Sequence, residues 1–426
     1  MKYQAPRGVK DLLPPDSENF RRLEDEIREV FGRSGFREVR LPIFESADLF
    51  SRSIGESTDI VEKEMYLFSG KGGETLALRP EGTASLIRAA IEHRLAEPGR
   101  VERLFYQGPM FRHERPQAGR LRQFHQAGAE LLGSSDPDDD VDLIATVSRH
   151  ALATAVPASR LLINSMGCPE CRPAYREILV GYLQKNRELL CETCQRRTET
   201  NPLRVLDCKI PSCQPVLEAA PHIAEFLCPA SRNHFERVCR GPRRGKRPLH
   251  RNPQACQRAR LLYRNGLRMG VGRLGEPNPH GRRGDAITDW SAISEEAMCQ
   301  GSGWPLALKD SFFSESWRGL FLWQPVRKFI WRSIPWRRPS RPYAHRILAA
   351  LRDQGISAVG IFGQARVKKA FLQAEREGAL FIGLVGGDEL SAGTITLKHL
   401  ASGLQKSLPA FPPEDLADAL RAPWLP

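Results

Sequence analysis

The densest group of chemically capable side chains lies in residues 111–130, FRHERPQAGRLRQFHQAGAE. Alternation of residue types predicts two strands joined by a loop, with Arg112 and Glu114 on one face of the first strand. Gln126 and Glu130 then share a face of the return strand. Arginine forks phosphate oxygens and carboxylates neutralise a cation, so such a floor suits a triphosphate substrate that also carries an amine. The spacing alone also allows a surface ladder of ion pairs, which is the less favoured interpretation.

Periodic segments on both sides predict the elements that would position this hairpin. Residues 17–33 have the apolar spacing of an amphipathic helix, and residues 75–79 read as a short strand that runs into a helix after RPEGT. The three aspartates at 138–140 are expected at a solvated helix start rather than in a metal site. Helical and strand patterns alternate over 343–408, as in a small α/β domain.

Several of these motifs carry a family resemblance. FRHERPQAGRLRQFHQ is similar to motif 2 of class II aminoacyl-tRNA synthetases, in the form found in the histidyl-tRNA synthetase family. PRGVKDLLP, TDIVEKEMYLF, LRPEGT and NPLRVLDCK resemble the same family in the same order, and the segment ending in TITLKHLASGLQ resembles its anticodon-binding domain. The resemblance covers residues 1–240 and 343–408. It implies an α+β fold: an antiparallel class II sheet flanked by helices, a helical insertion and a C-terminal α/β anticodon-binding domain.

The resemblance also implies domain limits and an activity. A catalytic domain is expected over 1–325 with an insertion at about 168–235, followed by an anticodon-binding domain over 326–426. The implied reaction is activation of L-histidine by ATP with Mg²⁺ to histidyl-adenylate, then transfer to the 3′ end of tRNA(His). A homodimer with an interface at residues 17–44 is implied as well. The alternative is a catalytically silent paralogue, such as a regulatory subunit of ATP phosphoribosyltransferase.

Site roles follow residue by residue from the same resemblance. Glu81 and Thr83 are expected at the α-amino group of histidine, and Gln126 and Glu130 would complete the amino-acid pocket. Arg112 is the expected catalytic residue, which contacts the ATP α-phosphate and the histidine carboxylate. The remaining motif 2 positions are Glu114 near the nucleotide and, for the tRNA acceptor end, Arg115, Gln117 and Arg120. No residue is assigned as a metal ligand of this site.

The positive charge of the chain is concentrated in one segment. The net charge is +13, from 63 Lys and Arg against 50 Asp and Glu. Residues 241–342 hold 20 basic and 7 acidic residues, so the rest of the chain is neutral with 43 of each sign. The same segment holds six of the seven tryptophans and shows neither helical nor strand periodicity. The net charge is therefore no evidence that the whole protein binds nucleic acid.

The same segment departs from the family pattern. An RGLDYYT motif with a catalytic arginine, a GGGGRYDGL loop and a motif 3 GLERL helix should follow residue 240, and none is written. Reading 252–271 one nucleotide out of frame permits TPRLVRGLDYYTxTAFEWVS. A two-nucleotide shift permits GGRYNGLV at 283–291, ALGLERL at 304–311 and VYLAVHTLEAT at 328–339. We therefore hypothesise that residues 241 to about 341 are read out of frame.

This hypothesis has consequences for structure and activity. Three single-nucleotide changes of one sign, near codons 240, 282 and 340, would restore the frame. The chain as written would lack half of the amino-acid pocket, so it is expected to be irregular over 241–341 and inactive. The alternative keeps the segment as a basic tRNA-binding arm on an inactive synthetase.

Ten cysteines and the N-terminus bear on metal binding and location. Cys168-x2-Cys171 and Cys191-x2-Cys194 have the spacing of a four-thiolate zinc site, and Cys208-x4-Cys213 adds a further pair. Free buried thiols are the favoured interpretation, and structural zinc at the first four is the alternative. Without an apolar N-terminal segment or a run of ~20 apolar residues, a cytoplasmic protein with reduced thiols and no membrane contact is expected.

Overall fold

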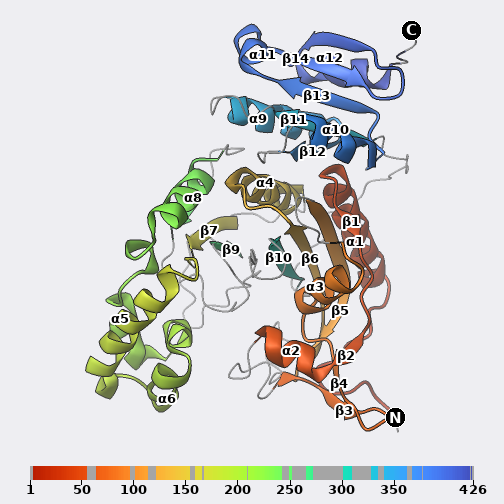
Figure 1. Ribbon diagram of the computed structural model, residues 1–426. Coiled ribbons are helices and arrows are strands. Elements are labelled where there is room, and N and C mark those ends of the chain that lie inside the picture. Colours follow the sequence, from red (N-terminus) through yellow and green to blue (C-terminus); the bar gives the residue numbers. More distant parts are fainter. Residues whose placement is uncertain are drawn as a thin grey trace.

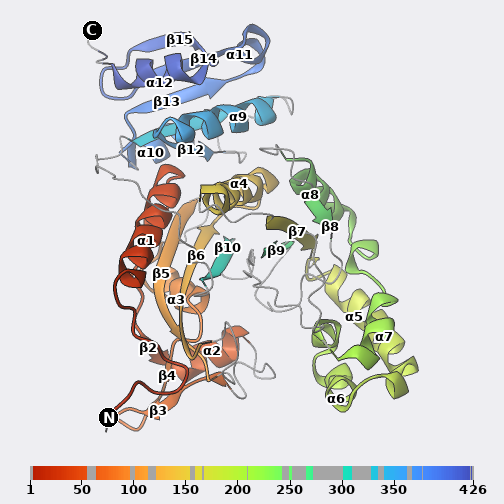
Figure 2. The same ribbon diagram turned by 180° about the vertical axis from the view of Figure 1, so that it is seen from behind.

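The computed structural model of the chain has three parts, which Figures 1 and 2 show from opposite sides. A sheet with flanking helices forms the first part, helices of residues 171–240 stand to one side, and a second sheet lies beyond residue 328. The structure describes residues 3–54, 64–95, 101–113, 121–153, 159–165, 167–208, 210–241, 249–251, 265–271, 301–308, 328–333, 340–361, 367–376, 378–422 and 424.

The central sheet is built on the hairpin that the sequence predicts. Strands β5 (Glu102–Phe111) and β6 (Gln123–Leu132) pair antiparallel over ten residues each. Strand β1 (Arg37–Glu38) lies parallel to β5, and β10 (Gly301–Leu308) lies antiparallel to β6, so the order is β1-β5-β6-β10. Together with its flanking helices, this sheet confirms the expected α+β fold.

A smaller sheet and two helices close one end of the hairpin. Strands β2 (Phe44–Ser46), β4 (Thr75–Leu78) and β3 (Leu67–Ser69) pair antiparallel in that order. Helix α2 (Ala47–Ile54) follows β2 directly, and helix α3 (Thr83–Glu92) follows β4 after the four residues RPEG. Because α3 starts immediately after RPEG, its first turn lies beside the face of β5 and β6 that carries polar side chains.

Two long helices cover the other face of the sheet. Helix α1 (Asp16–Arg33) agrees with the predicted amphipathic helix and buries Phe20, Ile27, Val30 and Phe31. Helix α4 (Pro137–Ala153) packs beside α1. The aromatic ring of Phe31 stacks on Phe105 of β5 at a centroid distance of 5.4 Å, which joins α1 to the hairpin. Burial of this apolar stripe is the main source of the stability of α1.

The helical part begins at a separate three-stranded sheet, in the order β8-β7-β9. Its strands are β7 (Ser159–Ser165), β8 (Leu249–Arg251) and β9 (Asn265–Val271). Between β7 and β8 the chain forms short helices: α5 (Cys171–Lys185), η2 (Arg187–Leu189), α6 (Glu192–Thr200), η3 (Pro202–Asp207), η4 (Pro211–Cys213), α7 (Gln214–Glu218), η5 (Ile223–Glu225) and α8 (Pro229–Arg240). None of the described helices is long and apolar enough to cross a membrane.

The C-terminal part is a five-stranded sheet with helices on it. Its strand order is β12-β11-β13-β14-β15, with parallel pairing around β11 and antiparallel pairing beyond β13. The elements in chain order are β11 (Lys328–Ser333), α9 (Ser340–Asp353), β12 (Ser357–Ile361), α10 (Val367–Arg376), β13 (Phe381–Val385), α11 (Gly387–Ala392), β14 (Thr394–His399), β15 (Gln405–Pro409) and α12 (Pro413–Arg421). The predicted alternation of helices and strands is confirmed here.

A buried ion cluster joins this part to the first, and it corrects one expectation. Asp142 of α4 accepts hydrogen bonds from Arg352 of α9 and from Arg103 of β5, the latter at 2.9 Å. Asp139 and Asp140, expected to be solvated, are 3% and 6% exposed. Asp139 also accepts from Arg103 at 3.2 Å, and Asp140 contacts His234 at 2.7 Å. The expected solvation was wrong because cationic partners distant in sequence surround this helix start.

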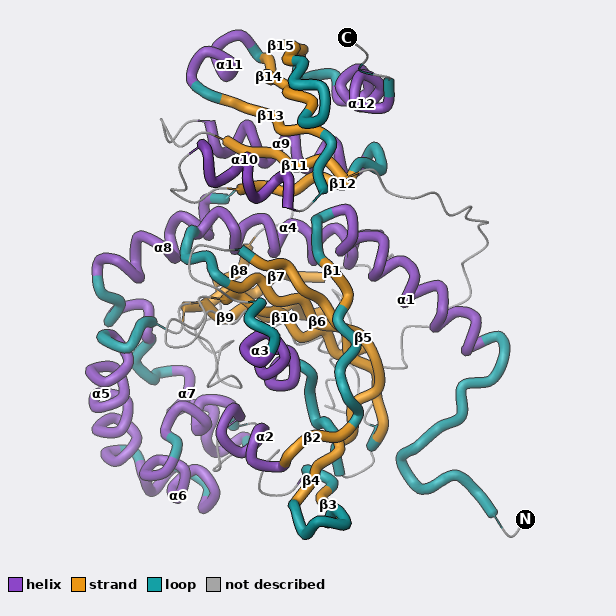
Figure 3. Tube along the Cα trace, turned by 45° about the vertical axis from the view of Figure 1, so that its right-hand side comes forward, coloured by secondary structure: helices purple, strands orange, loops and turns teal. Residues whose placement is uncertain are grey.

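The segment expected to be irregular contains four described strands, β8, β9, β10 and β11. The expectation is wrong for these strands. Each of them pairs with a strand from outside residues 241–341, as Figure 3 shows for β10 beside β6. Neighbouring strands offer backbone donors and acceptors whatever the side chains are, so they can hold β8, β9 and β10 at sheet edges and β11 between β12 and β13 with little demand on sequence. The other residues of the segment lie outside the described part of the chain, except at its two ends.

Candidate functional site

A network of buried polar side chains lies where α3 begins against β5 and β6. The hydroxyl of Thr83 donates to Oε1 of Glu130 at 3.0 Å and lies 3.3 Å from the hydroxyl of Tyr106. The side-chain amide of Gln126 donates to the same tyrosine hydroxyl at 3.2 Å. All four residues are at most 3% exposed. The network therefore brings Thr83, Gln126 and Glu130 together, as the sequence predicted.

Local sequence explains why these side chains can meet. Tyr106 of β5 stands directly opposite Gly128 of β6 in the antiparallel register. A Cβ at Gly128 would lie 2.4 Å from the Tyr106 ring, and one at Gly82 would lie 2.1 Å from it. Both glycines leave room for the ring between α3 and the sheet, because any larger residue would collide with it. Tyr106 was missed by sequence reasoning, and the glycine opposite it was the available signal.

One atom of this network has no partner among the described residues. The amide oxygen of Gln126 is buried and accepts no hydrogen bond there. A buried acceptor without a donor costs about 1–3 kcal/mol, so such atoms mark places where a ligand or water completes the structure. A bound molecule with an N–H or O–H group beside Gln126 would satisfy this oxygen.

Glu81 holds the start of α3. Its two carboxylate oxygens accept from the backbone N–H groups of Thr83 at 2.6 Å and of Ala84 at 2.9 Å. These are donors that a helix leaves unpaired in its first turn. The carboxylate therefore fixes the first turn of α3 and, through it, the position of the Thr83 hydroxyl.

The charges of the site favour a cationic guest. Burial raises the pKa of Glu130 well above its usual value, the hydrogen bond from Thr83 lowers it, and the negative charge of Glu81 raises it further. Burial also raises the pKa of Glu81, against the backbone hydrogen bonds and the charge of Arg112. Tyr106 has its pKa raised well above 10 by burial and by both carboxylates. An ammonium group near the two acids would lower both carboxyl pKa values.

Arg112 directly follows the last residue of β5. Its Nε donates to the backbone oxygen of Pro80 at 2.8 Å, and its guanidinium carbon lies 5.0 Å from the centre of the Phe124 ring. The backbone N–H of Arg112 donates to the oxygen of Arg122 at 2.9 Å, which continues the pairing beyond the two strands. Packing on an aromatic face and a hydrogen bond through Nε orient the guanidinium plane. The other predicted motif 2 residues, Glu114, Arg115, Gln117 and Arg120, lie outside the described residues.

The strand next to β6 contributes no polar group opposite the network. In the β10 register, Gly303 pairs with Glu130, Pro305 with Gly128 and Ala307 with Gln126. Glycine, proline and alanine carry no side chain that could bind a polar ligand. Pro305 also has no backbone N–H, so it cannot donate a hydrogen bond to β6. The described floor of the site is therefore polar on β5 and β6 only.

The predicted cysteine pairs are separated. Cys168 and Cys171 lie with Cys228, with Sγ atoms 3.3 Å and 3.6 Å from that of Cys168. The other pair, Cys191 and Cys194, lies in a different cluster with Cys208 and Cys213. The set Cys168, Cys171, Cys191 and Cys194 considered for zinc is thus wrong as a set, because the helices between the pairs hold them apart.

Comparison with known proteins gives a consistent result. Residues 8–169 match the family model described as Histidyl-tRNA synthetase, and residues 334–422 match the one described as Anticodon binding domain. The chain is 40% identical over 415 residues to the histidine–tRNA ligase of Trichlorobacter lovleyi, which covers 95% of this chain and 96% of that relative. It is 49% identical to that of Syntrophotalea carbinolica over 238 residues, 56% of this chain and 57% of the relative.

Among solved structures, the chain resembles apo histidyl-tRNA synthetase of S. aureus, with a TM-score of 0.54 at 26% identity. That likeness covers 99% of this chain and 100% of the other. The two family models leave residues 170–333 between them, a range that contains the basic segment up to β11.

Proposed function

This chain belongs to the histidyl-tRNA synthetase family, and on that premise we propose that its gene encodes a histidine–tRNA ligase whose written sequence is defective. In the proposed reaction, L-histidine is activated by ATP, supplied with Mg²⁺, and the histidyl group is transferred to the 3′ end of tRNA(His). The defect is assigned to residues 241 to about 341, read in a shifted frame.

The observation that supports the substrate is the buried network around Glu130. Histidine offers an α-ammonium group, which suits the two carboxylates of Glu81 and Glu130, whose pKa values are raised by burial. The same ammonium group, or an imidazole N–H, would supply the donor that Gln126 Oε1 requires. Thr83 fixes the position of Glu130 through its hydroxyl. These groups recognise a small cationic amine, and the family assigns the amine to histidine.

Arg112 supports the activation step. In the proposed reaction a histidine carboxylate oxygen attacks the ATP α-phosphorus, and pyrophosphate leaves. Negative charge then develops on the α-phosphate oxygens, where a fixed guanidinium is most effective. Arg112 is already oriented by Pro80 and Phe124, so little ordering is needed on substrate binding.

The written residues of the segment support the proposed defect. The family pattern calls for RGLDYYT, with a catalytic arginine and tyrosines, where the written chain has residues 252–271, and for motif 3 GLERL near residues 304–311. The written chain has neither motif, and its β10 places Gly303, Pro305 and Ala307 opposite the network. Three described strands, β9, β10 and β11, overlap segments for which a shifted frame permits family sequence. The positions of these strands thus support the family fold, whereas the written residues lack the side chains that the family motifs would supply.

The decisive experiment compares two proteins in histidine-dependent ATP–pyrophosphate exchange. One is the chain as written, and the other is the frame-restored chain, obtained by correcting the three single-nucleotide changes. We expect exchange by the frame-restored chain only, with at least about a 10³-fold difference, because several transition-state contacts are lost together. Exchange by the written chain would overturn the defect, and resequenced DNA identical to the written frame would overturn its proposed cause.

The alternatives predict other results. A regulatory paralogue of ATP phosphoribosyltransferase would show no exchange in either chain. A basic tRNA-binding arm would give the written chain a salt-sensitive affinity for RNA that is lost on deleting residues 241–284. Under the proposed function that deletion changes no specific RNA affinity.

We also propose that the protein is a cytoplasmic homodimer. Large apolar side chains are exposed on β2 and β3, where Phe44 and Phe68 are 53% and 41% exposed and their ring centres lie 6.0 Å apart. Ile43 and Leu67, which adjoin these two residues in the chain, are exposed as well, at 48% and 55%. An exposed apolar patch of this kind is typical of a protein interface, and it adjoins the predicted interface at 17–44. Light scattering of Phe44→Asp against the unsubstituted chain would test it, with a monomer expected for the variant.

A further inference from the structure

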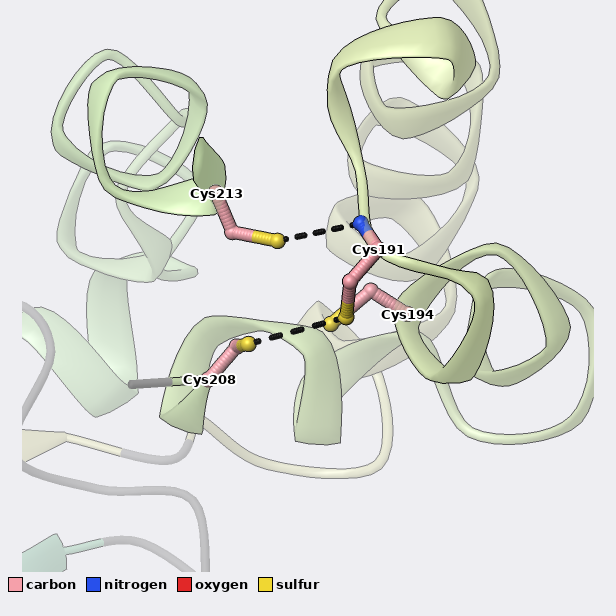
Figure 4. A group of neighbouring side chains, drawn as sticks. All are labelled: Cys191, Cys194, Cys208 and Cys213. Atoms are coloured by element: carbon pink, nitrogen blue, oxygen red, sulfur yellow. Dashed lines mark hydrogen bonds between the residues drawn. The ribbon is translucent and has the colours of Figure 1, made fainter. Parts of the chain in front are cut away.

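Four cysteines from two short segments converge in the helical part. Cys191 precedes α6 and Cys194 lies in its first turn, while Cys208 follows η3 and Cys213 ends η4. Their four Sγ atoms all lie within 4.8 Å of one another. Figure 4 shows the four side chains pointing toward a common centre from α6 on one side and from the η3–η4 segment on the other. We propose that this cluster is a structural zinc site with four thiolate ligands.

The spacing of the sulfur atoms fits a tetrahedral metal. Zn–S bonds of about 2.3 Å at tetrahedral angles place sulfur atoms about 3.8 Å apart. The Sγ atoms of Cys191 and Cys208 are 4.0 Å apart, which is close to that value and about twice a disulfide bond length. All four cysteines are free thiols in the structure. A small contraction of the cluster would give the full coordination geometry.

The chain pattern is that of a zinc site as well. The ligands follow as C-x2-C and C-x4-C, separated by the thirteen residues from 195 to 207. Pairs of cysteines two to four residues apart are the common way in which one short turn supplies two zinc ligands. The second pair becomes part of the cluster only because η3 folds back along α6.

Backbone donors are already aimed at two of the sulfurs. The N–H of Cys191 donates to Sγ of Cys213 at 3.2 Å, and the N–H of Ile210 donates to Sγ of Cys208 at 3.5 Å. Such N–H···S bonds are the outer shell that stabilises metal-bound thiolates. The positive end of the α6 dipole lies at Cys191 and Cys194 and favours negative sulfur in the same way.

The surrounding structure needs a crosslink at this place. Between Arg187 and Glu225 the described helices are three to nine residues long, and several are single 3₁₀ turns. Helices this short are not stable alone, and small folds with little regular structure are commonly held by a metal. Cys194 and Cys213 are fully buried, whereas Cys191 and Cys208 are partly exposed, so an ion can enter from the side of the latter two.

A second cysteine cluster provides an internal contrast. Cys168, Cys171 and Cys228 supply three thiols, and the hydroxyl of Ser231 lies 3.4 Å from Sγ of Cys228. A serine hydroxyl is a poor zinc ligand beside thiolates. The proposal is therefore confined to the cluster with four thiols.

The test is metal analysis of the full-length chain purified under reducing conditions without chelator. We expect about one zinc ion held by the four-thiolate cluster, and zinc-edge X-ray absorption showing four sulfur neighbours at about 2.3 Å. Replacement by Co²⁺ should give the intense visible bands of a tetrahedral thiolate site. This result does not depend on catalysis, because all four cysteines lie outside residues 241–341.

Variants assign the ion to the cluster. Cys208→Ser should lose the zinc and the cobalt spectrum and lower the melting temperature. The matched control, Cys239→Ser, changes a buried cysteine of α8 outside both clusters and should keep both. Zinc retained by Cys208→Ser, or a metal-free chain with a disulfide among the four cysteines, would overturn the proposal. If Cys208→Ser fails to fold, the sulfur count from X-ray absorption of the unsubstituted chain still decides.

Discussion

The β5–β6 hairpin and the segment 241–341 both contribute strands to the same sheet, but by different means. Each polar side chain of the hairpin site has a partner from another element, such as Thr83 for Glu130 and Pro80 for Arg112. The strands of the segment are held through backbone pairing to strands outside it. Backbone pairing requires only an extended chain, whereas a network of side chains requires particular residues. A sheet position can therefore be filled by a sequence that lacks the side chains of a functional site.

The largest expected effect concerns the buried ion cluster that joins the hairpin to the C-terminal part. Asp142→Asn breaks the buried cluster with Arg103 and Arg352 and should lower the free energy of unfolding by about 3–5 kcal/mol. The loss should be equal in the written and frame-restored chains, since the cluster involves no residue of the segment. Urea denaturation of both chains measures it. Unequal losses would mean that the hairpin side does not fold independently. The control is Asp418→Asn. It removes an exposed ion pair with Arg421, which contributes at most about 1 kcal/mol to the free energy of unfolding.

The same carboxylate predicts a dependence on pH. Despite burial, the Arg352 and Arg103 guanidinium groups hold the pKa of Asp142 well below its usual value. The folded state therefore binds this proton less readily than the unfolded state, whose pKa is about 3.9. The stabilisation should be present above about pH 4 and be lost as the pH falls below it. In Asp142→Asn this part of the acid sensitivity should disappear. Asp139 acts in the opposite direction between about pH 4 and 7, because burial raises its pKa to about 7.

The next effect concerns the guanidinium group of Arg112. In the frame-restored chain, Arg112→Lys keeps the charge but removes the planar fork, and kcat for pyrophosphate exchange should fall about 10²- to 10³-fold. In the written chain the same change should alter nothing, since exchange is already at background. Arg240→Lys, an exposed arginine of α8 paired with Glu236, is the matched control and should keep full activity. An active Arg112→Lys would remove this residue from the proposed mechanism.

Ligand binding should distinguish the frame-restored chain from the written chain without any catalytic turnover. Histidine and ATP together, each at about 100 times its dissociation constant, should stabilise the frame-restored chain by at least about 2.7 kcal/mol. The melting temperature of the written chain should not change, because only one side of its pocket is polar. Glycine in place of histidine is the control. An equal shift in both chains would show that the hairpin alone forms a sufficient pocket.

The smallest effect is expected at the unpaired amide oxygen. Gln126→Leu in the frame-restored chain should raise KM for histidine about tenfold, equivalent to about 1.4 kcal/mol, with a smaller change in kcat. Gln107→Leu changes a glutamine of the neighbouring strand at a position that alternates to the other face. It should leave KM unchanged. Equal effects of the two variants would assign Gln126 a purely structural role.

Sequence reasoning succeeded where the signal is local. The hairpin, α1 and the C-terminal elements have clear periodicity. Thr83, Gln126 and Glu130 lie close together in the structure, and the site roles that the motif resemblance implies for them stay predictions. Tyr106 was missed because its role depends on the empty space at Gly82 and Gly128 from two other elements.

Long-range partners caused the other errors. The burial of Asp139 and Asp140 depends in part on Arg103 and His234, which lie 36 and 94 residues away, so no short window of sequence reveals it. Cys208 and Cys213 join Cys191 and Cys194 only after η3 and η4 have folded. The regular strands within 241–341 were missed for the opposite reason, because their neighbours in the sheets impose them.

Strand β5 connects two distant parts of the molecule mechanically, through the contacts made at its two ends. Arg103 near its start belongs to the ion cluster with α9 and also donates to the backbone oxygen of Gly360 in β12, while Arg112 directly follows its last residue. Nine residues of extended chain make a rod of about 30 Å, paired along its length with β6. Any tilt of the C-terminal sheet must pull on one end of this rod. Under the proposed function, β5 therefore links the anticodon-binding domain mechanically to the arginine proposed to align the reacting phosphate.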